Sequence, residues 1–281
     1  KLNNLQHIPR FHRLCNNFEF PVTYLVTHEV ANSPYARELF LPYLRLKQCE
    51  IGAHLHAWSF NKEIDSLTYS HPYAFEYDYN TLHKMIKSLT ISIENNLEVK
   101  PISYRSGRYG ICSNQVKILK RIGYKIESSI TPGINWSNAA THPQAELDFR
   151  NFPKRVYNID MNDLQMDGDS GLYEVPISTF DLKTYKNKLK NILGYKYTKV
   201  QFRINKHISV KVLKSFVDIA LSQNATYIML FLHSSELMPG GSPYFRNKDD
   251  IDNMYNKYTE ILNYLRYKRV EGIMLKHTPL Y

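Results

Sequence analysis

The stretch Glu50-Ile51-Gly52-Ala53-His54-Leu55-His56-Ala57-Trp58 places two histidines two residues apart, directly after a short apolar run. In an extended strand, successive side chains point to opposite faces, so His54 and His56 would lie on the same face. Neutral imidazole is a common metal ligand, and two imidazoles at one strand end can bind a single metal ion. The sequence therefore predicts a strand over Glu50–His54 that ends in a candidate metal-binding pair.

Short apolar strands alternate with longer helical stretches on both sides of this segment. Strands are predicted over Val22–Thr27, Glu50–His54, Ile102–Ser106, Lys125–Ile130, Tyr173–Ile177, Thr226–His233 and Val270–Leu275. Helices are predicted over Pro34–Leu46, Thr81–Asn96, Ser113–Arg121, His207–Leu221 and Lys248–Tyr267. This alternation is typical of βαβ units around a parallel sheet, and the units are numerous enough for a barrel.

In such barrels, functional residues gather at the carboxyl ends of the strands. His54, Arg105 and His233 all fall at predicted strand ends. Two long segments, Ser59–Asn80 and Thr131–Gly171, interrupt the alternation and are rich in aromatic residues. Long segments of this kind are often functional, so we expect ordered loops over the same end of the barrel.

The composition is that of an ordinary globular protein. Of its 281 residues, 43% are hydrophobic and 22% are charged, and no linker or internal repeat divides them. We therefore expect a single domain over residues 1–281. No apolar run approaches the roughly 18 residues of a membrane-spanning helix, so no integral membrane segment is expected.

The chain is basic, with 36 Lys and Arg against 26 Asp and Glu, a net charge of +10. These charges are scattered and accompany no nucleic-acid motif, so a solvated basic surface is favoured over a nucleic-acid partner. Cys15, Cys49 and Cys112 form neither a metal motif nor a disulfide framework, which favours a reducing compartment. We expect a cytoplasmic protein, with attachment to a membrane surface as the alternative.

Three further segments carry polar residues to predicted strand ends. Residues 104–110 read YRSGRYG, with Arg105 and Arg108 on either side of a glycine. Residues 126–132 read IESSITP, a strand that runs into a proline turn. Residues 230–241 read LFLHSSELMPGG, in which His233 leaves an apolar strand and enters a glycine-rich loop. The strand-end histidine pair thus has three candidate neighbours.

These four segments, in this order, resemble the polysaccharide deacetylase family, of the NodB-homology or carbohydrate esterase type. The closest likeness is to a branch associated with bacterial surface-polysaccharide and lipopolysaccharide biosynthesis. In that branch, sequence motifs such as Glu-Ile-Gly-Ala-His-Leu-His, Arg-x-Gly-Arg-Tyr-Gly and His-Ser-Ser-Glu-Leu-x-Pro-Gly recur. The resemblance extends from about Val22 to the C-terminus.

The resemblance implies a distorted (β/α)7-type barrel and a metal-dependent hydrolase that removes N-acetyl groups from sugars of a bacterial surface polysaccharide or lipopolysaccharide. An N-acetylated glycan would be the substrate. The family's metal is often Zn²⁺, with Co²⁺, Ni²⁺ or Mn²⁺ as alternatives, and it is held by one Asp and two His. Such a metal polarises the acyl carbonyl and binds the attacking water.

The metal ligands carry over only in part. His54 matches the first metal histidine of the family. The second family histidine follows four residues later, where this chain has Trp58. His56 is therefore predicted as the second ligand, and His71 from the following segment is the alternative.

The remaining site residues are assigned by their place in the motifs. His233 matches the late histidine, which implies a general acid, and Arg105 matches the arginine that orients a catalytic carboxylate. The residues expected to contact the sugar are Arg108, Tyr109, Trp58, Trp136 and Tyr244.

The family's Asp-containing strand has no counterpart in the expected place. It should precede Val22, but Lys1–Pro21 contains no Asp. The first strand is therefore predicted to be missing, either because the chain is incomplete at its N-terminus or because the carboxylates were lost. Glu127 and Glu236 are candidate substitutes. A catalytically inactive glycan-binding domain of the same fold, or a metal-independent amide hydrolase, remains the alternative function.

Overall fold

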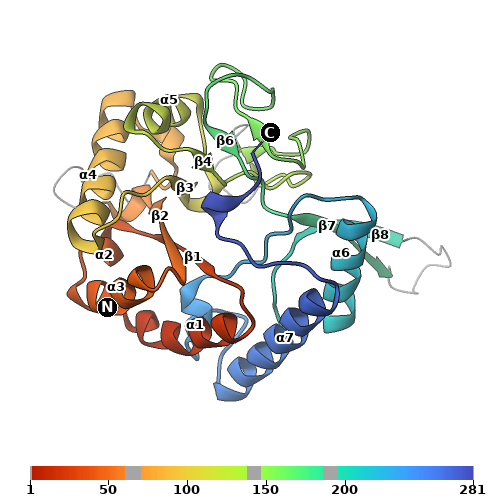
Figure 1. The fold of residues 1–281 in the computed structure, drawn as a ribbon. Coiled ribbons are helices and arrows are strands. Elements are labelled where there is room, and N and C mark those ends of the chain that lie inside the picture. Colours follow the sequence, from red (N-terminus) through yellow and green to blue (C-terminus); the bar gives the residue numbers. More distant parts are fainter. Residues whose placement is uncertain (1, 61–70, 138–146, 186–194, 281) are drawn as a thin grey trace.

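The computed structural model describes residues 2–60, 71–137, 147–185 and 195–280, and for residues 183–185 and 195–197 it describes the backbone alone. A six-stranded sheet in the order β1-β2-β3-β4-β6-β5 forms its centre (Figure 1). The strands are β1 (Val22–Val26), β2 (Cys49–Leu55), β3 (Ser103–Ser106), β4 (Ile126–Glu127), β5 (Tyr157–Asn158) and β6 (Tyr173–Glu174). Neighbouring strands are parallel except for β5, which pairs antiparallel to β6.

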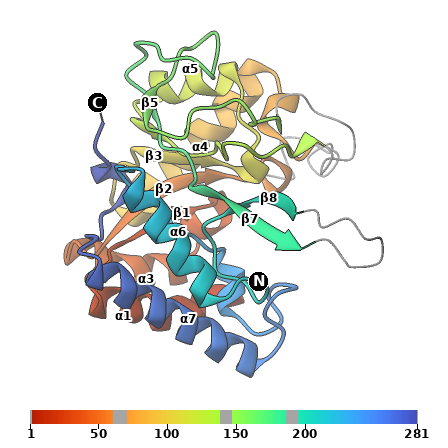
Figure 2. The ribbon, with the colours of Figure 1, turned by 90° about the vertical axis from the view of Figure 1, so that its right-hand side faces the viewer.

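Some helices pack along the sheet, and others form a pair beside it. The described α-helices are α1 (Ile8–Asn17), α2 (His28–Ala31), α3 (Pro34–Arg45), α4 (Tyr79–Leu97), α5 (Ser113–Ile122), α6 (Val210–Ser222) and α7 (Lys248–Tyr267). Helices α3, α4 and α5 lie along the β1–β4 part of the sheet, whereas α6 and α7 pack against each other (Figures 1 and 2). None of the described helices is both long and apolar enough to cross a membrane.

Local sequence explains where the helices begin. The Ser33 hydroxyl accepts a hydrogen bond from the Ala36 amide at 3.4 Å, and Pro34 occupies the first turn of α3. Both features are preferred at helix N-termini, because the first amides have no partner within the helix. Asn247 caps α7 in the same way through the Asp250 amide, at 2.9 Å. The predicted bounds of α7, Lys248–Tyr267, are confirmed.

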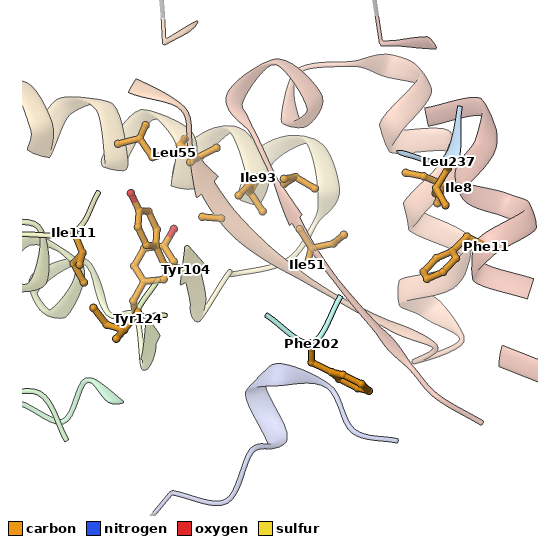
Figure 3. Packing of buried hydrophobic residues seen from close by; sticks show 14 of the residues in the cluster. Ile8, Phe11, Ile51, Leu55, Ile93, Tyr104, Ile111, Tyr124, Phe202 and Leu237 are labelled. Atoms are coloured by element: carbon orange, nitrogen blue, oxygen red, sulfur yellow. The ribbon is translucent and has the colours of Figure 1, made fainter. Parts of the chain in front are cut away.

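The core lies between the sheet and the helices (Figure 3). Tyr104 of β3 and Leu55 of β2 are almost completely buried, and Tyr104 meets Tyr124 edge-on at 5.6 Å. Ile8 and Phe11 of α1 lie beside Leu237, which ties the N-terminal helix to the short helix η7 (Ser234–Leu237) (Figure 3). Each fully buried side chain of this size contributes roughly 1.5–3 kcal/mol through the hydrophobic effect.

The prediction of strands over Thr226–His233 and Val270–Leu275 is wrong, because neither segment pairs with a strand in the described sheets. Both segments lie outside the hydrogen-bonded sheets of the described residues, so no closed ladder completes a barrel. In each segment a side chain accepts a backbone amide that a ladder would otherwise pair: the Met229 amide donates to Ser178 Oγ and the Leu275 amide to Thr23 Oγ1, both at 2.9 Å.

Residues 226–233 still alternate like a strand. Ile228, Leu230 and Leu232 pack against the main core, whereas Tyr227 and Met229 pack against a smaller cluster around Val175. The predicted strands Lys125–Ile130 and Tyr173–Ile177 are also present but shorter, as β4 and β6.

The sequence analysis missed the helices α1 and α2, the short strand β5 and a hairpin. Helix α1 follows the short helical turn η1 (Asn3–His7), so two helical elements precede β1. A two-stranded antiparallel sheet joins β7 (Thr179–Tyr185) to β8 (Tyr195–Gln201). Phe180 of β7 stacks on Phe216 of α6 at 4.7 Å, which anchors the hairpin beside the helix pair (Figure 2).

Candidate functional site

The carboxyl ends of β1, β2, β3 and β4 meet at one edge of the sheet. His54 pairs with Arg105 in the register of β2 and β3, and Tyr104 pairs with Glu127 in that of β3 and β4. Parallel pairing therefore brings the residues that follow each strand to the same side of the molecule. The predicted site residues His54 and Arg105 lie at this edge.

His54 is held in one orientation by the backbone of the neighbouring strand. Its Nδ1 lies 2.8 Å from the Arg105 carbonyl oxygen. A carbonyl oxygen only accepts, so Nδ1 carries the proton and Nε2 keeps its lone pair. Burial, then the adjacent His56, lowers the pKa of His54 to about 3. The ring is therefore neutral at physiological pH and presents a hydrogen-bond acceptor or metal donor.

His56 and Trp58 continue this arrangement as a ring stack. The His54 and His56 centroids are 4.5 Å apart with a steep interplanar angle of 69°. His56 stacks on Trp58 at 4.1 Å and 21°, and the Arg108 guanidinium carbon lies 4.9 Å from the Trp58 ring centroid. Burial, then the charges of His233 and Arg108, lowers the pKa of His56 to about 4. The structure thus brings together four of the predicted residues.

Gly107 makes this stack sterically feasible. A Cβ atom at Gly107 would lie 2.7 Å from the Trp58 ring and 2.6 Å from the Leu55 carbonyl oxygen. Contacts that short are not observed for real side chains, so the indole can lie here only over a glycine. Arg108, the next residue, has a left-handed backbone with φ of 51°. That conformation is uncommon for a residue with a side chain and turns Arg108 back towards Trp58.

Arg105 contacts a serine and a methionine where a carboxylate was expected. Its Nε donates to the Ser128 carbonyl at 2.6 Å, and its Nη2 donates to Ser128 Oγ at 2.9 Å and lies 3.0 Å from Met229 Sδ. Burial lowers the pKa of Arg105 from its ordinary value. The proposed role in orienting a catalytic carboxylate stays a prediction.

His233 reaches the site from the C-terminal half and is held by Arg203. The Arg203 Nη2 lies 2.8 Å from His233 Nδ1 and 2.8 Å from Glu236 Oε1. Glu236 Oε2 accepts the His233 backbone amide at 3.0 Å, so these three residues form a closed unit. His233 is exposed overall, but desolvation of its ring, then the charge of Arg203, lowers its pKa to about 4.

Arg203 is a site residue that sequence reasoning missed. It follows β8 in the stretch Gln201-Phe202-Arg203, which belongs to no motif. Only the fold brings it to His233, which is 30 residues further along the chain. The basic and aromatic character of the surrounding stretch was visible but did not single out this residue.

The other predicted sugar contacts form a second group. Tyr109 stacks on Trp136 at 5.5 Å and 18°, and the Trp136 indole Nε1 donates to Thr131 Oγ1 at 2.8 Å. Trp136 and Tyr244 both line a pocket of about 190 Å³, to which Arg203 also belongs. Arg203 therefore lies between this pocket and the histidines.

The described donor set does not fit the three-ligand metal site that the sequence resemblance implies. Among the described residues, no group of three His, Cys, Asp or Glu side chains is arranged to hold a metal ion. Beyond His54 and His56, the nearby charges are those of arginines, which repel a cation. His71, the alternative ligand, lies beside Tyr77, whose hydroxyl donates to the His71 carbonyl at 2.8 Å.

The strand beside the histidines carries no carboxylate at its last residues. Since Val26 pairs with Ala53, the next residue, Thr27, lies beside His54 on the same face. His28 turns towards Phe60, with ring centroids 4.6 Å apart. Residues 3–17 are helical, so β1 is the first strand of the described chain.

The two candidate substitute carboxylates are engaged elsewhere. Glu236 pairs with Arg203, as described above. Glu127 is fully buried and accepts hydrogen bonds from the Ser129 hydroxyl and, at 2.8 Å, from the Ser129 amide. Burial, then the charge of Glu127, raises the pKa of Glu174 well above its usual range, which favours the protonated form of Glu174.

No protein-family model matches the sequence, and no curated protein has significant similarity to it. A protein from Mycobacterium smegmatis, assigned as a polysaccharide deacetylase, has a similar structure with a TM-score of 0.50 and 14% identity over 98% of this chain and 82% of that chain. The Xyl-CE4 domain of a multidomain xylanase from the hindgut metagenome of Trinervitermes trinervoides gives a TM-score of 0.45 and 8% identity over 98% and 83% of the two chains. The first likeness establishes the fold, so the predicted α/β, barrel-like class with a mostly parallel sheet is confirmed.

Proposed function

We propose that this chain is a hydrolase of the polysaccharide deacetylase type, which removes an N-acetyl group from a sugar of a bacterial surface polysaccharide or lipopolysaccharide. The observation that carries the proposal is the proximity of His54, His56 and His233, which influence one another electrostatically at the carboxyl edge of the parallel strands. In α/β folds of this kind, that edge is where catalytic residues gather. The deacetylase-type fold supplies the reaction class.

The chain's own residues suit amide hydrolysis in distinct ways. His54 presents the Nε2 lone pair, which can hold a water molecule. His233 accepts from Arg203 at Nδ1, so its Nε2–H can donate to the acyl oxygen as negative charge develops there. The oxygen of this water bonds to the acyl carbon, while the neutral imidazole that holds the water accepts one of its protons. The imidazole then passes this proton to the sugar nitrogen, and the C–N bond breaks. The products are acetate and the free amine.

Metal dependence is a separate question in this proposal. A divalent ion at His54 and His56 would activate water and polarise the acyl group, as the resemblance implies. Because no group of three donors among the described residues is arranged to hold a metal ion, no catalytic step is assigned to a metal. The steps above require only the imidazoles, and the assay below separates the two cases.

The test is acetate release from N-acetylhexosamine oligomers and from lipopolysaccharide sugars, using the full chain. We expect release by the wild type and a loss of at least about 100-fold in His54→Ala and in His56→Ala, as for loss of a general base. His207→Ala is the matched control, because His207 is exposed and lies outside the site. Reactions with chelator, Zn²⁺ or Co²⁺ report metal dependence. Absence of release from all these glycans under all these conditions would refute the proposal.

A second function, glycan binding without hydrolysis, is favoured by the donor set around His54. Equilibrium binding to N-acetylated oligosaccharides without acetate release would establish it. Elemental analysis sharpens the distinction: stoichiometric Zn²⁺ that is lost in the double variant His54→Ala, His56→Ala would count against an inactive site.

A further inference from the structure

The pocket of about 190 Å³ beside His233 has an unusual lining. Two of its side chains, Lys199 and Arg203, are cationic, and two, Trp136 and Tyr244, are aromatic. None of the described residues that line it is acidic. The pocket is smaller than the roughly 300–1,000 Å³ typical of drug-sized ligands, so it fits a group of about one sugar ring.

Each of the two cations is held in place by an ion pair. Lys199 Nζ lies 2.6 Å from Asp181 Oδ2, and Arg203 pairs with Glu236 at 2.8 Å. Only about a fifth of either basic side chain is exposed, at 20% for Lys199 and 18% for Arg203. Partly buried charges are screened less by salt than exposed ones, so their field reaches into the pocket.

A third cation leaves this positive charge incompletely balanced. Burial, then the like charge of Lys199, lowers the pKa of Lys154. Three basic groups, Lys154, Lys199 and Arg203, therefore share the two carboxylates of Asp181 and Glu236. An incoming anion would relieve this repulsion, because like charges close together destabilise one another.

The Lys199 stem runs directly against Gly133. A Cβ atom at Gly133 would lie 2.6 Å from Lys199 Cε, and the φ of 82° at this position favours glycine. Trp136 is equally fixed by its stacking on Tyr109 and its hydrogen bond to Thr131. Groups held in place before binding lose little conformational entropy when a ligand arrives.

We propose that this pocket binds a negatively charged sugar unit, with its carboxylate or phosphate against Lys199 and Arg203 and its ring against Trp136. The choice of a sugar rests on the proposed function, whereas the choice of an anion rests on the pocket itself. Arg203 contacts both the pocket and His233, so the acidic unit would be the neighbour of the unit that reaches the histidines. The substrate is accordingly an acidic glycan.

Direct binding tests this without requiring hydrolysis. Calorimetric titrations compare three probes at equal ionic strength: an oligosaccharide containing glucuronate, its length-matched neutral N-acetylglucosamine oligomer, and a sugar phosphate. We expect at least one acidic probe to bind about tenfold or more tightly than the neutral oligomer, as for a charge-assisted hydrogen bond. The uronate and phosphate arms identify which acid the pocket prefers.

Variants assign the preference to the pocket. Lys199→Met should reduce binding of the acidic probe about tenfold and leave the neutral oligomer unchanged. Lys214→Met is the matched control, because it removes the same charge from an ion pair with Glu260 on α6 and α7. An equal loss in both variants, or equal binding of acidic and neutral probes by the wild type, would overturn the proposal.

A spectroscopic readout covers the case in which Lys199→Met fails to fold. The chain has two tryptophans, Trp58 and Trp136, so its two indole resonances are assigned with one Trp136→Phe variant. The acidic probe should shift the Trp136 resonance of the wild type at concentrations where the neutral oligomer does not. A shift confined to Trp58 would place the acid outside the pocket and refute the inference. Binding without acetate release would refute only the hydrolase.

Discussion

The Arg203 Nη2 atom lies 2.8 Å from His233 Nδ1. A guanidinium can only donate, so Nδ1 must accept and the proton of the neutral ring must reside on Nε2. The imidazolium, which carries a proton on both nitrogens, cannot form this contact. A general acid would need that charged form near neutral pH, so the acid role predicted for His233 is opposed by its partner.

The tautomer of His233 is therefore the first prediction. Nitrogen-15 spectra should show the Nε2–H form in the wild type. In Arg203→Met the pKa of His233 should rise from about 4 by about one unit or more, because a neighbouring positive charge is removed. Lys214→Met should leave it unchanged. An Nδ1–H form, or an equal pKa in both proteins, would contradict the assignment.

The second prediction concerns stability in mild acid. Burial depresses the pKa of His54 to about 3 and that of His56 to about 4, below the usual 6.5. Between these depressed values and pH 6.5, the unfolded chain therefore binds more protons than the folded protein. Stability should therefore fall as the pH falls below about 6.5, by about 2 kcal/mol per histidine at about pH 5.

The measurement is the free energy of unfolding by denaturant at several pH values. Protonation of the buried Glu174 works in the opposite sense, because its raised pKa favours the folded state at low pH. The informative comparison is therefore between the wild type and the double variant His54→Gln, His56→Gln. The free energy of unfolding of this variant should depend less steeply on pH. Parallel curves would show that the two histidines do not titrate as described.

The third prediction is that Gly107→Ala destabilises the fold and displaces Trp58. The added methyl group meets both the indole and the fixed carbonyl of Leu55, and overpacking of this kind costs about 1–3 kcal/mol. Thermal unfolding and the Trp58 indole resonance measure the two effects. Gly171→Ala is a useful comparison, since nothing lies within 4 Å of its Cβ position and only backbone strain is added. An unaltered indole resonance in Gly107→Ala would contradict the stacking geometry.

The fourth prediction concerns Glu50, which links four segments of the chain. Its carboxylate accepts from Ser103 Oγ at 2.5 Å, and from Thr23 Oγ1 and the Lys276 amide at 2.9 Å each. Glu50→Ala should cost about 3 kcal/mol or more, because several buried donors lose their acceptor together. Glu50→Gln should cost less, and the exposed Glu260→Gln should cost almost nothing. Equal unfolding free energies for Glu50→Ala and Glu260→Gln would contradict this role.

Elements with strong local signals were predicted well. The caps and apolar periodicity of α3 and α7 fixed their starts, and β1, β2 and β3 lie within one or two residues of their expected bounds. Helix α1 was missed although Ile8, Phe11 and Cys15 form an apolar stripe, because charged residues interleave it. The segment 226–233 was overpredicted because a buried apolar run gives the same signal with or without a ladder.

The site was predictable only as far as its motifs extended. Spacing along β2 placed His54 and His56 on one face, and the fold brings Trp58 and Arg108 to them. The contact of Arg203 with His233 depends on how β8 packs beside residues 226–233, which no local pattern records. The metal, the catalytic roles of Arg105 and His233, and the single-domain organisation stay predictions.

The bond network of Glu50 also constrains the order of folding. Thr23 and Glu50 receive the amides of Leu275 and Lys276, which lie 252 and 226 residues away along the chain. Contacts of such high sequence separation form late, because long loops must close first. During synthesis, β1 and β2 therefore remain incompletely satisfied until Leu275 and Lys276 have left the ribosome. Removing the residues from Leu275 onward should leave the Glu50 carboxylate and Thr23 underbonded in an otherwise complete sheet.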